Sequence, residues 1–163
     1  MNIHEAIEAI DGIVPDAKHG LPEEVFLLAS RLTPMVNVDL LLKDAAGRTL
    51  LSWRDDKFAG KGWHVPGGII RYKESFEERI QKTAVKELGC EIKFDPVPIA
   101  IEQFFCEHIS RGHFISFLFK CSFFGGFTPE NKGLEETSPG LLKWHAKCPD
   151  NMINIHEAYR KYI

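Results

Sequence analysis

The sequence lacks the features that mark several specialised classes of protein. Its four cysteines show no CxxC pair and no cysteine and histidine spacing of the zinc type, so we expect buried free thiols. No apolar run approaches the length of about 20 residues that spans a bilayer. The first residues include acids in place of a basic region and a long apolar segment, so we expect no signal peptide. These absences indicate a soluble protein in a reducing, cytoplasmic setting, with no membrane partner.

The sequence also lacks a large excess of either positive or negative charge. The chain has 20 Lys and Arg residues against 23 Asp and Glu residues, which gives a formal net charge of −3. Such a chain lacks the overall positive charge that binds a nucleic-acid backbone, so we expect no nucleic-acid partner. Small anionic substrates stay open, because a few local basic groups suffice to bind them. The 163 residues, 44% hydrophobic and 26% charged, fit one ordinary globular domain.

The first 33 residues are predicted to form a helical extension in front of a main domain at residues 34–163. Apolar residues recur at helical spacing over residues 2–10, which predicts a short amphipathic helix. Residues 22–32 begin with a proline and two acids, as a first helical turn prefers, and stop before Pro34. The apolar faces of both helices must be buried against the main domain or a second subunit.

The main domain is predicted to contain strands on both sides of one central helix. Apolar and β-branched composition indicates strands at residues 35–42, 48–54, 91–94, 98–106, 113–124 and 141–145. Residues 55–62 are predicted to be a polar loop, and residues 151–162 a closing helix. The polar loop at residues 128–140 is long enough to be functional rather than a bare connector.

The stretch from Trp63 to Ile92 organises the rest of the chain. Gly67 and Gly68 let the backbone approach a ligand closely, because no side chain obstructs it. The helix that follows is predicted to begin at Ser75, which has the capping-box spacing to a glutamate three residues on, and to end near Gly89.

Glu87 is the residue of this helix that is the clearest candidate for a metal ligand. It lies one turn from Thr83, off the predicted apolar stripe, where a carboxylate can lean over the glycine loop. Hard cations such as Mg²⁺ are commonly held by one or two carboxylates, a backbone carbonyl, water and substrate phosphate. The alternative is an ordinary solvated helix face.

The same stretch resembles the Nudix box, G-x5-E-x7-R-E-U-x-E-E-x-G-U. Its positions are occupied here by Gly68, Glu74, Glu87, Gly89 and Cys90, with Lys82 in place of the arginine. Thr83 replaces one box glutamate and Lys86 another, which leaves Glu87 as the one metal-binding carboxylate of the box. This reduced box resembles that of the GDP-mannose mannosyl hydrolase branch, and the similarity extends from about residue 32 to about residue 144.

The resemblance implies roles for residues inside and outside the box. Gly68 would offer its carbonyl and Glu87 its carboxylate to Mg²⁺, or to Mn²⁺ in its place. Asp39 matches a substrate-contacting aspartate, and the cost of burying an acid within an apolar strand also favours a site role. Arg54 matches an arginine that steadies the departing diphosphate. Ile69 stands where the branch has an arginine, for which Arg71 would compensate.

The late loop and the aromatic residues complete the set of candidates. The branch takes a further metal ligand and a histidine base from this loop, and here Glu136 is chosen for the metal side, with Glu135 in reserve. No histidine lies in the loop, so the base of the branch is missing. Trp63 is a candidate for stacking on a substrate base, the alternative being packing. Phe114 is expected to pack, and His64, His108 and His113 are expected to be structural or surface residues.

The resemblance implies a single Nudix α/β/α sandwich, with a mixed sheet between helices, and a homodimer. Three functions stay open. The first is Mg²⁺-dependent hydrolysis of a nucleoside-diphosphate sugar of the GDP-mannose or GDP-glucose type to sugar and nucleoside diphosphate. The second is a pyrophosphohydrolase that attacks phosphorus in a nucleotide or a nucleoside diphosphate linked to another group. The third is a nucleotide-binding module whose box has lost catalysis.

Overall fold

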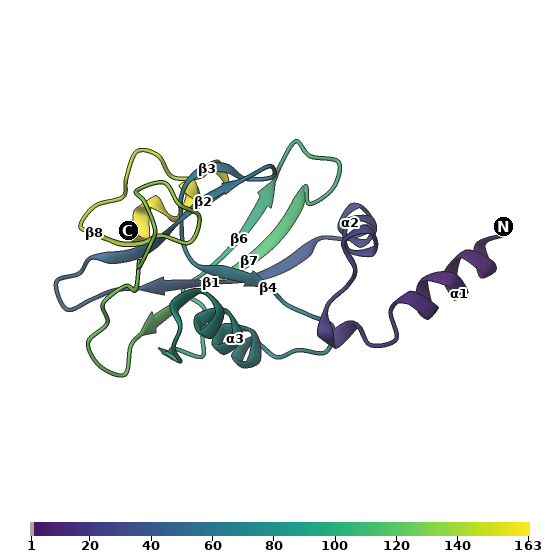
Figure 1. The fold of residues 1–163 in the computed structure, drawn as a ribbon, viewed down its shortest axis with the longest axis horizontal. Coiled ribbons are helices and arrows are strands. Elements are labelled where there is room, and N and C mark those ends of the chain that lie inside the picture. Colours follow the sequence, from purple (N-terminus) through teal and green to yellow (C-terminus); the bar gives the residue numbers. More distant parts are fainter. Residues whose placement is uncertain (1) are drawn as a thin grey trace.

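The structure, a computed structural model, describes residues 2–163 (Figure 1). Its helices are α1 (Ile3–Ile13), α2 (Glu23–Leu32) and α3 (Phe76–Leu88), with 3-10 helices η1 (Ala17–His19) and η2 (Asn154–Tyr162). Its strands are β1 (Met35–Leu42), β2 (Thr49–Asp56), β3 (Gly60–His64), β4 (Gly67–Ile69), β5 (Lys93–Phe94), β6 (Ala100–Phe105), β7 (His113–Ser122) and β8 (Leu142–His145). The closing helix is thus a 3-10 helix that begins three residues later than predicted.

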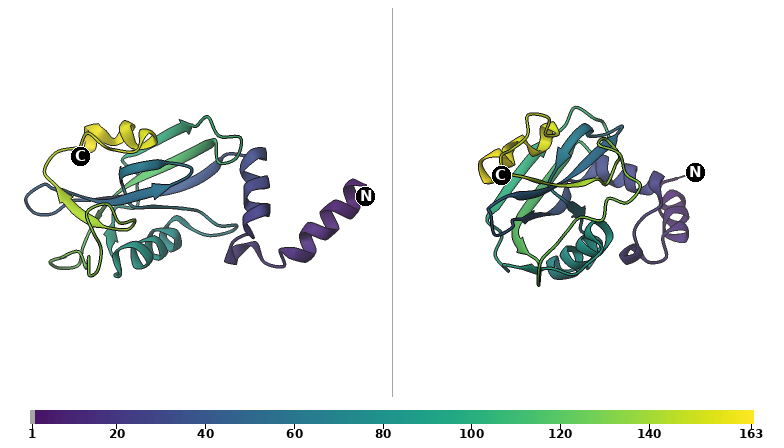
Figure 2. Two further views of the ribbon diagram at one scale, coloured as in Figure 1. Left: turned by 45° about the horizontal axis from the view of Figure 1, so that its top comes forward. Right: turned by 60° about the vertical axis from the view of Figure 1, so that its left-hand side comes forward.

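A mixed sheet forms the middle layer. Its strands run in the order β4, β1, β7, β5, and β6 also pairs with β7. The long strands β1 and β7 are parallel, whereas β4 is antiparallel to β1, and β5 and β6 are antiparallel to β7. Helix α3 lies on one side of this sheet and η2 on the other (Figures 1 and 2). The predicted α/β/α sandwich with a mixed sheet is therefore confirmed.

A second, antiparallel sheet has the order β3, β2, β8. The prediction of a loop at residues 55–62 was wrong, because β2 continues to Asp56 and turns directly into β3. The side chain of Asp56 closes the turn by accepting hydrogen bonds from the backbone N–H groups of Phe58 and Ala59, both at 2.8 Å. Polar and glycine residues therefore mark a hairpin here, which carries Trp63 and His64 into the interior.

Helix α3 forms as its sequence predicts. Ser75 accepts a hydrogen bond from the Glu78 N–H, and the Glu78 carboxylate accepts one from the Ser75 N–H, so the capping box is complete. Gly89 ends the helix in the left-handed conformation, at φ 76°. Ile80, Ala84 and Leu88 of the predicted stripe are buried against the sheet, whereas Phe76 is 41% exposed.

The N-terminal extension has two helices with different surroundings. Helix α1 has no buried residue, stands away from the body of the chain and exposes Ile3, Ile7 and Ile13 (Figure 2). Its apolar face is therefore not buried against the main domain, which was one of the two expected outcomes. Helix α2 lies against the end of the mixed sheet, and the boundary at residue 33 stays a prediction.

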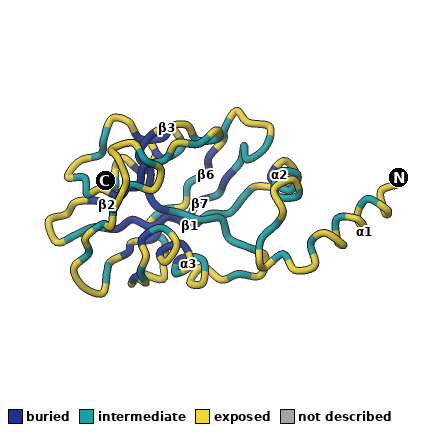
Figure 3. Tube along the Cα trace, in the orientation of Figure 1, coloured by how far each residue is buried: buried dark blue, intermediate teal, exposed yellow. Residues whose placement is uncertain are grey.

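The core has two apolar clusters, one between α3 and the mixed sheet and one between the sheets and η2. Figure 3 shows that buried stretches lie along the strands and on α3, whereas α1 has none. All four cysteines are free, but only Cys121 is buried, so the expectation of four buried thiols was wrong for the other three. Within residues 2–163, no helix is both long and apolar enough to cross a membrane.

Candidate active site

A cleft of about 490 Å³ opens where the glycine loop meets α3. Its walls come from α2, the β2–β3 hairpin, β4, the face of α3, the turn before β7 and the start of η2. Segments from residue 21 to residue 156 therefore meet here. Of the predicted site residues, Gly68, Glu87, Arg54 and Arg71 line this cleft.

Glu87 is the carboxylate of α3 that faces the cleft. Its Oε2 is buried and has no hydrogen-bond partner. Burial raises the pKa of this carboxyl from its ordinary value of 4.5 to about 7, against the opposing influence of the positive charges of Arg54 and Lys86. A buried carboxylate oxygen without a partner is costly, so Oε2 is suited to receive a cation or a proton from a ligand.

The two glycines at the edge of the cleft are required by close approaches. A Cβ on Gly67 would collide with Oδ1 of Asp39, and a Cβ on Gly68 would lie 2.5 Å from Oγ1 of Thr83. Thr83 therefore packs directly on the glycine loop. The short side chain that replaces a box glutamate thus occupies the space beside Gly68.

Oxygen atoms without partners gather along this cleft. Besides Glu87 Oε2, the buried Thr83 Oγ1 and Asn37 Oδ1 have no hydrogen-bond partner, and all three residues line the cleft. Within the described residues, no cluster of three or more His, Cys, Asp or Glu side chains is arranged to hold a metal. Such a donor set fits Mg²⁺ or Mn²⁺ only where substrate phosphate and water supply the remaining oxygens.

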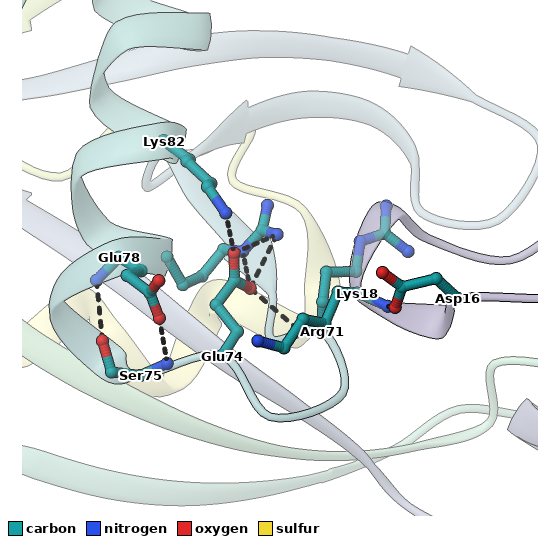
Figure 4. A network of polar contacts seen from close by, with 8 residues as sticks. Asp16, Lys18, Arg71, Glu74, Ser75, Glu78 and Lys82 are labelled. Carbon is teal, nitrogen blue, oxygen red and sulfur yellow. Dashed lines mark hydrogen bonds and ion pairs between the residues drawn. The ribbon is translucent and has the colours of Figure 1, made fainter.

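Glu74 holds the glycine loop against α3. Its carboxylate accepts two hydrogen bonds from Arg79, at 2.7 and 2.9 Å, and one from Lys82 at 2.9 Å. It also accepts a bond of 2.9 Å from the backbone N–H of Arg71 (Figure 4). Arg79, three residues before Lys82, therefore makes the bidentate contact that a lysine at the box arginine position cannot make.

Arg54 and Arg111 supply positive charge to the same cleft. Arg54 lines the cleft and forms an ion pair of 3.1 Å with Asp56. Arg111, which the sequence did not single out, places its guanidinium 4.4 Å from the ring centre of Phe58 and 5.7 Å from that of Phe26. Its Nε is buried without a hydrogen-bond partner. A cation held between two rings and left without a carboxylate is ready to bind an anion.

Arg71 also lines the cleft, at the side of the N-terminal extension. A Cβ on Gly20 would lie 3.3 Å from the guanidinium carbon of Arg71, so the glycine leaves room for this side chain. The extension thus forms part of the wall, through Leu21, Glu23, Phe26 and Leu27. Sequence patterns gave no sign of this contact, because residue 20 and residue 71 are far apart in the chain.

Asp39 lies behind the cleft rather than on its surface. It is 2% exposed, and the Tyr159 hydroxyl donates a hydrogen bond of 2.7 Å to its Oδ2. Burial raises the pKa of Asp39 to about 6, and the hydrogen bond from Tyr159 opposes the change. The structure therefore shows Asp39 paired with Tyr159 in the interior, and direct substrate contact by Asp39 stays untested.

Three further candidates lie away from the cleft. Trp63 is 7% exposed, with its ring centre 5.2 Å from that of Trp53 and 4.5 Å from that of His145, so it packs in the core. Glu135 and Glu136 are exposed on the late loop and do not line the cleft. In this arrangement none of the three reaches Glu87, because packing holds Trp63 inside and the loop lies elsewhere on the surface.

Two buried histidines line the cleft as well. His64, expected to be structural, and His156, which the sequence did not single out, have ring centres 6.0 Å apart. Burial lowers the pKa of His64 to about 3 and that of His156 well below its ordinary value. Both rings are therefore neutral at physiological pH. His64 is close to the box in the sequence, whereas His156 is far from it. Only the folded structure shows that His156 belongs to the cleft.

Solved structures share this arrangement of elements. A MutT Nudix hydrolase from Burkholderia pseudomallei is 19% identical, with a TM-score of 0.65, over 80% of this chain and 98% of that one. A Nudix hydrolase from Nitrosomonas europaea is 18% identical, with a TM-score of 0.58, over 80% and 70%. A UDP-X diphosphatase is 19% identical, with a TM-score of 0.56, over 86% and 66%. The chain therefore has the Nudix hydrolase fold.

A curated relative matches part of the sequence. Low-salt glycan biosynthesis protein Agl8 of Haloferax volcanii is 26% identical over 104 residues, which cover 61% of this chain and 66% of Agl8. The match thus spans slightly less than two thirds of that relative. No protein-family model matches the chain.

Proposed function

We propose that this protein is a Nudix hydrolase that uses a divalent cation to cleave a nucleoside diphosphate joined to a second group. The observation that carries the proposal is the buried Oε2 of Glu87, which has no hydrogen-bond partner, in a cleft that four arginines also line. The Nudix fold and the spacing of Gly68, Glu74 and Glu87 support the same function. A binding module that had lost catalysis would have no need to keep a buried carboxylate with an unsatisfied oxygen, which is destabilising.

The proposed roles follow from charge and position. Glu87 and the Gly68 carbonyl would hold Mg²⁺ or Mn²⁺, with Thr83 Oγ1 and Asn37 Oδ1 as further oxygens beside it. When bound, the cation neutralises charge on the phosphates and stabilises the charge that grows on the leaving group. Arg54 and Arg111 would bind the diphosphate from the opposite side.

The preferred substrate is a nucleoside-diphosphate sugar of the GDP-mannose or GDP-glucose type. The reduced box, which keeps Glu87 and replaces its neighbours by Thr83 and Lys86, supports this choice through its resemblance to the mannosyl hydrolase branch. Similarity to a protein named for glycan biosynthesis agrees with a sugar-containing substrate. Cleavage at phosphorus is the second candidate, favoured by the fold shared with a UDP-X diphosphatase and by the absence of a histidine from the late loop.

We also propose that the protein forms a homodimer through α1. This helix is capped and amphipathic, yet it has no buried residue, and Ile3, Ile7 and Ile13 are exposed. Strand β6 exposes Ile101 and Phe105 beside the edge of the mixed sheet. A second copy would remove both apolar surfaces from water.

Product analysis in ¹⁸O-water separates the candidate reactions. The protein is incubated with Mg²⁺ and, in turn, GDP-mannose, GDP-glucose, ADP-ribose and nucleoside triphosphates. Free labelled sugar with nucleoside diphosphate is the expected outcome. Sugar phosphate with nucleoside monophosphate supports cleavage at phosphorus, and no turnover of any compound contradicts the enzymatic function.

A further inference from the structure

His64 and His156 face the cleft with opposite hydrogen-bonding characters. Nδ1 of His64 lies 2.8 Å from the backbone carbonyl oxygen of Ser52. A carbonyl oxygen only accepts, so Nδ1 of His64 carries the proton. Because burial keeps this ring neutral, its Nε2 has a free lone pair and is an acceptor.

His156 is fixed in the other tautomer. The backbone N–H of Val65 donates a hydrogen bond of 3.0 Å to Nδ1 of His156. An Nδ1 that accepts carries no proton, so the ring is neutral and its Nε2 carries an N–H donor. The hydrogen bond from His64 to the Ser52 carbonyl and the one from the Val65 N–H to His156 thus set the two tautomers without any ligand.

The free Nε2 atoms have no partner within the described chain. Neither forms a hydrogen bond, and neither is among the fully buried polar atoms that lack one, so both keep some exposure, and both residues line the cleft. Two hydrogen bonds of about 2.8 Å that meet at one tetrahedral oxygen hold their nitrogens about 4.6 Å apart. Ring centres 6.0 Å apart suit this spacing, because each nitrogen stands off its ring centre.

We propose that His64 and His156 form a subsite that binds one hydroxyl group of the substrate, which donates to Nε2 of His64 and accepts from Nε2–H of His156. A hydroxyl is the group that donates and accepts through one atom. Arg54 lines the same cleft as the two rings, so a hydroxyl bound here would share the cleft with the diphosphate that Arg54 is proposed to bind. The inference rests on the proposed function, because the hydroxyl belongs either to the sugar or to the ribose of such a substrate.

Asparagine substitutions test the subsite while keeping the structural hydrogen bonds. The amide of asparagine reaches the position of Nδ1 but not that of Nε2. His64→Asn therefore retains a donor to the Ser52 carbonyl, and His156→Asn retains an acceptor for the Val65 N–H. Each removes only the group that faces the cleft. His4→Gln, on exposed α1, is the matched control.

The binding experiment measures dissociation constants by calorimetry with EDTA present, which stops metal-dependent turnover. The probes are GDP-mannose, its analogues with one mannosyl hydroxyl replaced by hydrogen, and its 2′-deoxy and 3′-deoxy ribose analogues. One replacement should weaken binding to the unmodified protein and to His4→Gln by about tenfold. The same replacement should change binding to either asparagine variant by less than about twofold, because the contact is already lost.

Fluorine in place of that hydroxyl separates the two bonds, since fluorine accepts weakly and cannot donate. The loss of affinity that fluorine causes, relative to the hydroxyl, should disappear in His64→Asn. Equal affinity for all analogues in the unmodified protein, or a penalty that survives in both asparagine variants, would overturn the subsite. The position of the sensitive hydroxyl identifies sugar or ribose as its source.

The tautomers are tested without any ligand. Long-range ¹H–¹⁵N spectra of the unmodified protein, assigned with the two asparagine variants, should show Nδ1–H for His64 and Nε2–H for His156 at pH 7. The reverse tautomers, or charged rings, overturn the inference. If the product analysis with Mg²⁺ shows hydrolysis of no nucleoside-diphosphate sugar, the proposed substrate is wrong, and the subsite that rests on it is overturned as well. Hydrolysis of such sugars without any hydroxyl preference overturns the subsite alone.

Discussion

Glu87 shows how a single residue is kept ready for a ligand at a cost in stability. Its carboxyl is buried with Oε2 lacking a hydrogen-bond partner, and burial raises its pKa from 4.5 to about 7. A protein normally satisfies such a group or leaves it exposed. Thr83, Asn37 and Arg111 also contribute buried polar atoms without partners to the same cleft. Their concentration in one place is what distinguishes this cleft from an ordinary surface depression.

The first prediction concerns stability and pH. Below pH 4.5 the Glu87 carboxyl is protonated whether the chain is folded or unfolded, so the buried group carries no penalty. As the pH rises through about 7, the folded chain must ionise a buried group that the unfolded chain ionised earlier, and stability is lost. At pH 8, Glu87→Gln should therefore be more stable than the unmodified protein by about 1–3 kcal/mol.

Urea unfolding with EDTA present, at pH 4.5 and pH 8, measures this difference. Comparison of the two proteins at each pH cancels the contributions of the buried histidines. Glu91→Gln, an exposed change just after α3, is the control and should have the same stability difference at both pH values. A Glu87→Gln variant that is equally or less stable at pH 8 would contradict the burial cost.

The pair of Asp39 and Tyr159 gives a second prediction. Tyr159→Phe removes the hydroxyl that donates 2.7 Å to the buried carboxylate, so Asp39 loses its described side-chain partner at Oδ2. The free energy of unfolding at pH 7 should fall by about 1–3 kcal/mol, and the pKa of Asp39 should rise further. Tyr72→Phe, where the side chain is exposed, should change the unfolding free energy little. Equal values for the two variants would show that the hydroxyl contributes no stability.

Arg111 gives a third prediction. Arg111→Met keeps an unbranched side chain between Phe26 and Phe58 and removes the positive charge from the cleft. The affinity for GDP should fall by about tenfold, with little change for guanosine, because the loss is specific to the phosphates. Arg48→Met, on the turn between β1 and β2, is the charge-matched control. A similar loss in both variants would indicate a general effect of net charge.

At the scale of elements, helix α3 and the strands it packs on are the parts that sequence reasoning found. Ser75, Glu78 and Gly89 mark both ends of the helix through local hydrogen bonds, so their spacing alone predicts it. The short strand β4 and the β2–β3 hairpin were missed. The two glycines of β4 pack closely against Asp39 and Thr83, and Gly62 of β3 lies against the backbone of residues 151 and 153, so this packing involves distant residues.

The candidate site, like the fold, was predicted only where its residues lie close together in the sequence. Gly68 and Glu87 belong to one continuous motif, and the structure places both on the cleft. Arg111, His156 and Phe26 reach the cleft from separate segments, and no local pattern marks a residue as part of a wall that forms only on folding. The resemblance also pointed to Glu136 and Trp63, which the structure places elsewhere.

Helix α1 gives the fourth prediction. Replacing Ile3 and Ile7 by serine should leave the melting temperature within a few degrees, because neither residue packs against the rest of the described chain. Under the proposed homodimer, light scattering coupled to size exclusion should show the unmodified protein as a dimer and the double variant as a monomer. The same mass for both proteins would remove α1 from the interface.

At the scale of the whole molecule, the fold brings the Glu87 carboxylate, a glycine loop, four arginines and two neutral histidines to a single cleft. The α/β/α layers hold α3 against the glycine loop, and the N-terminal extension closes one side. The molecule therefore combines a reduced Nudix box with a wall made by segments outside the box. The central claim is that Glu87 is the group that makes this cleft catalytic.

The rate of Mg²⁺-dependent hydrolysis by Glu87→Gln tests that claim most directly. The substrate is the compound that product analysis shows to be cleaved fastest, and Glu91→Gln is the matched control. The rate should fall by about a hundredfold or more in Glu87→Gln, while Glu91→Gln retains the full rate. Hydrolysis by Glu87→Gln at the unmodified rate, with the same dependence on Mg²⁺, would contradict the assignment.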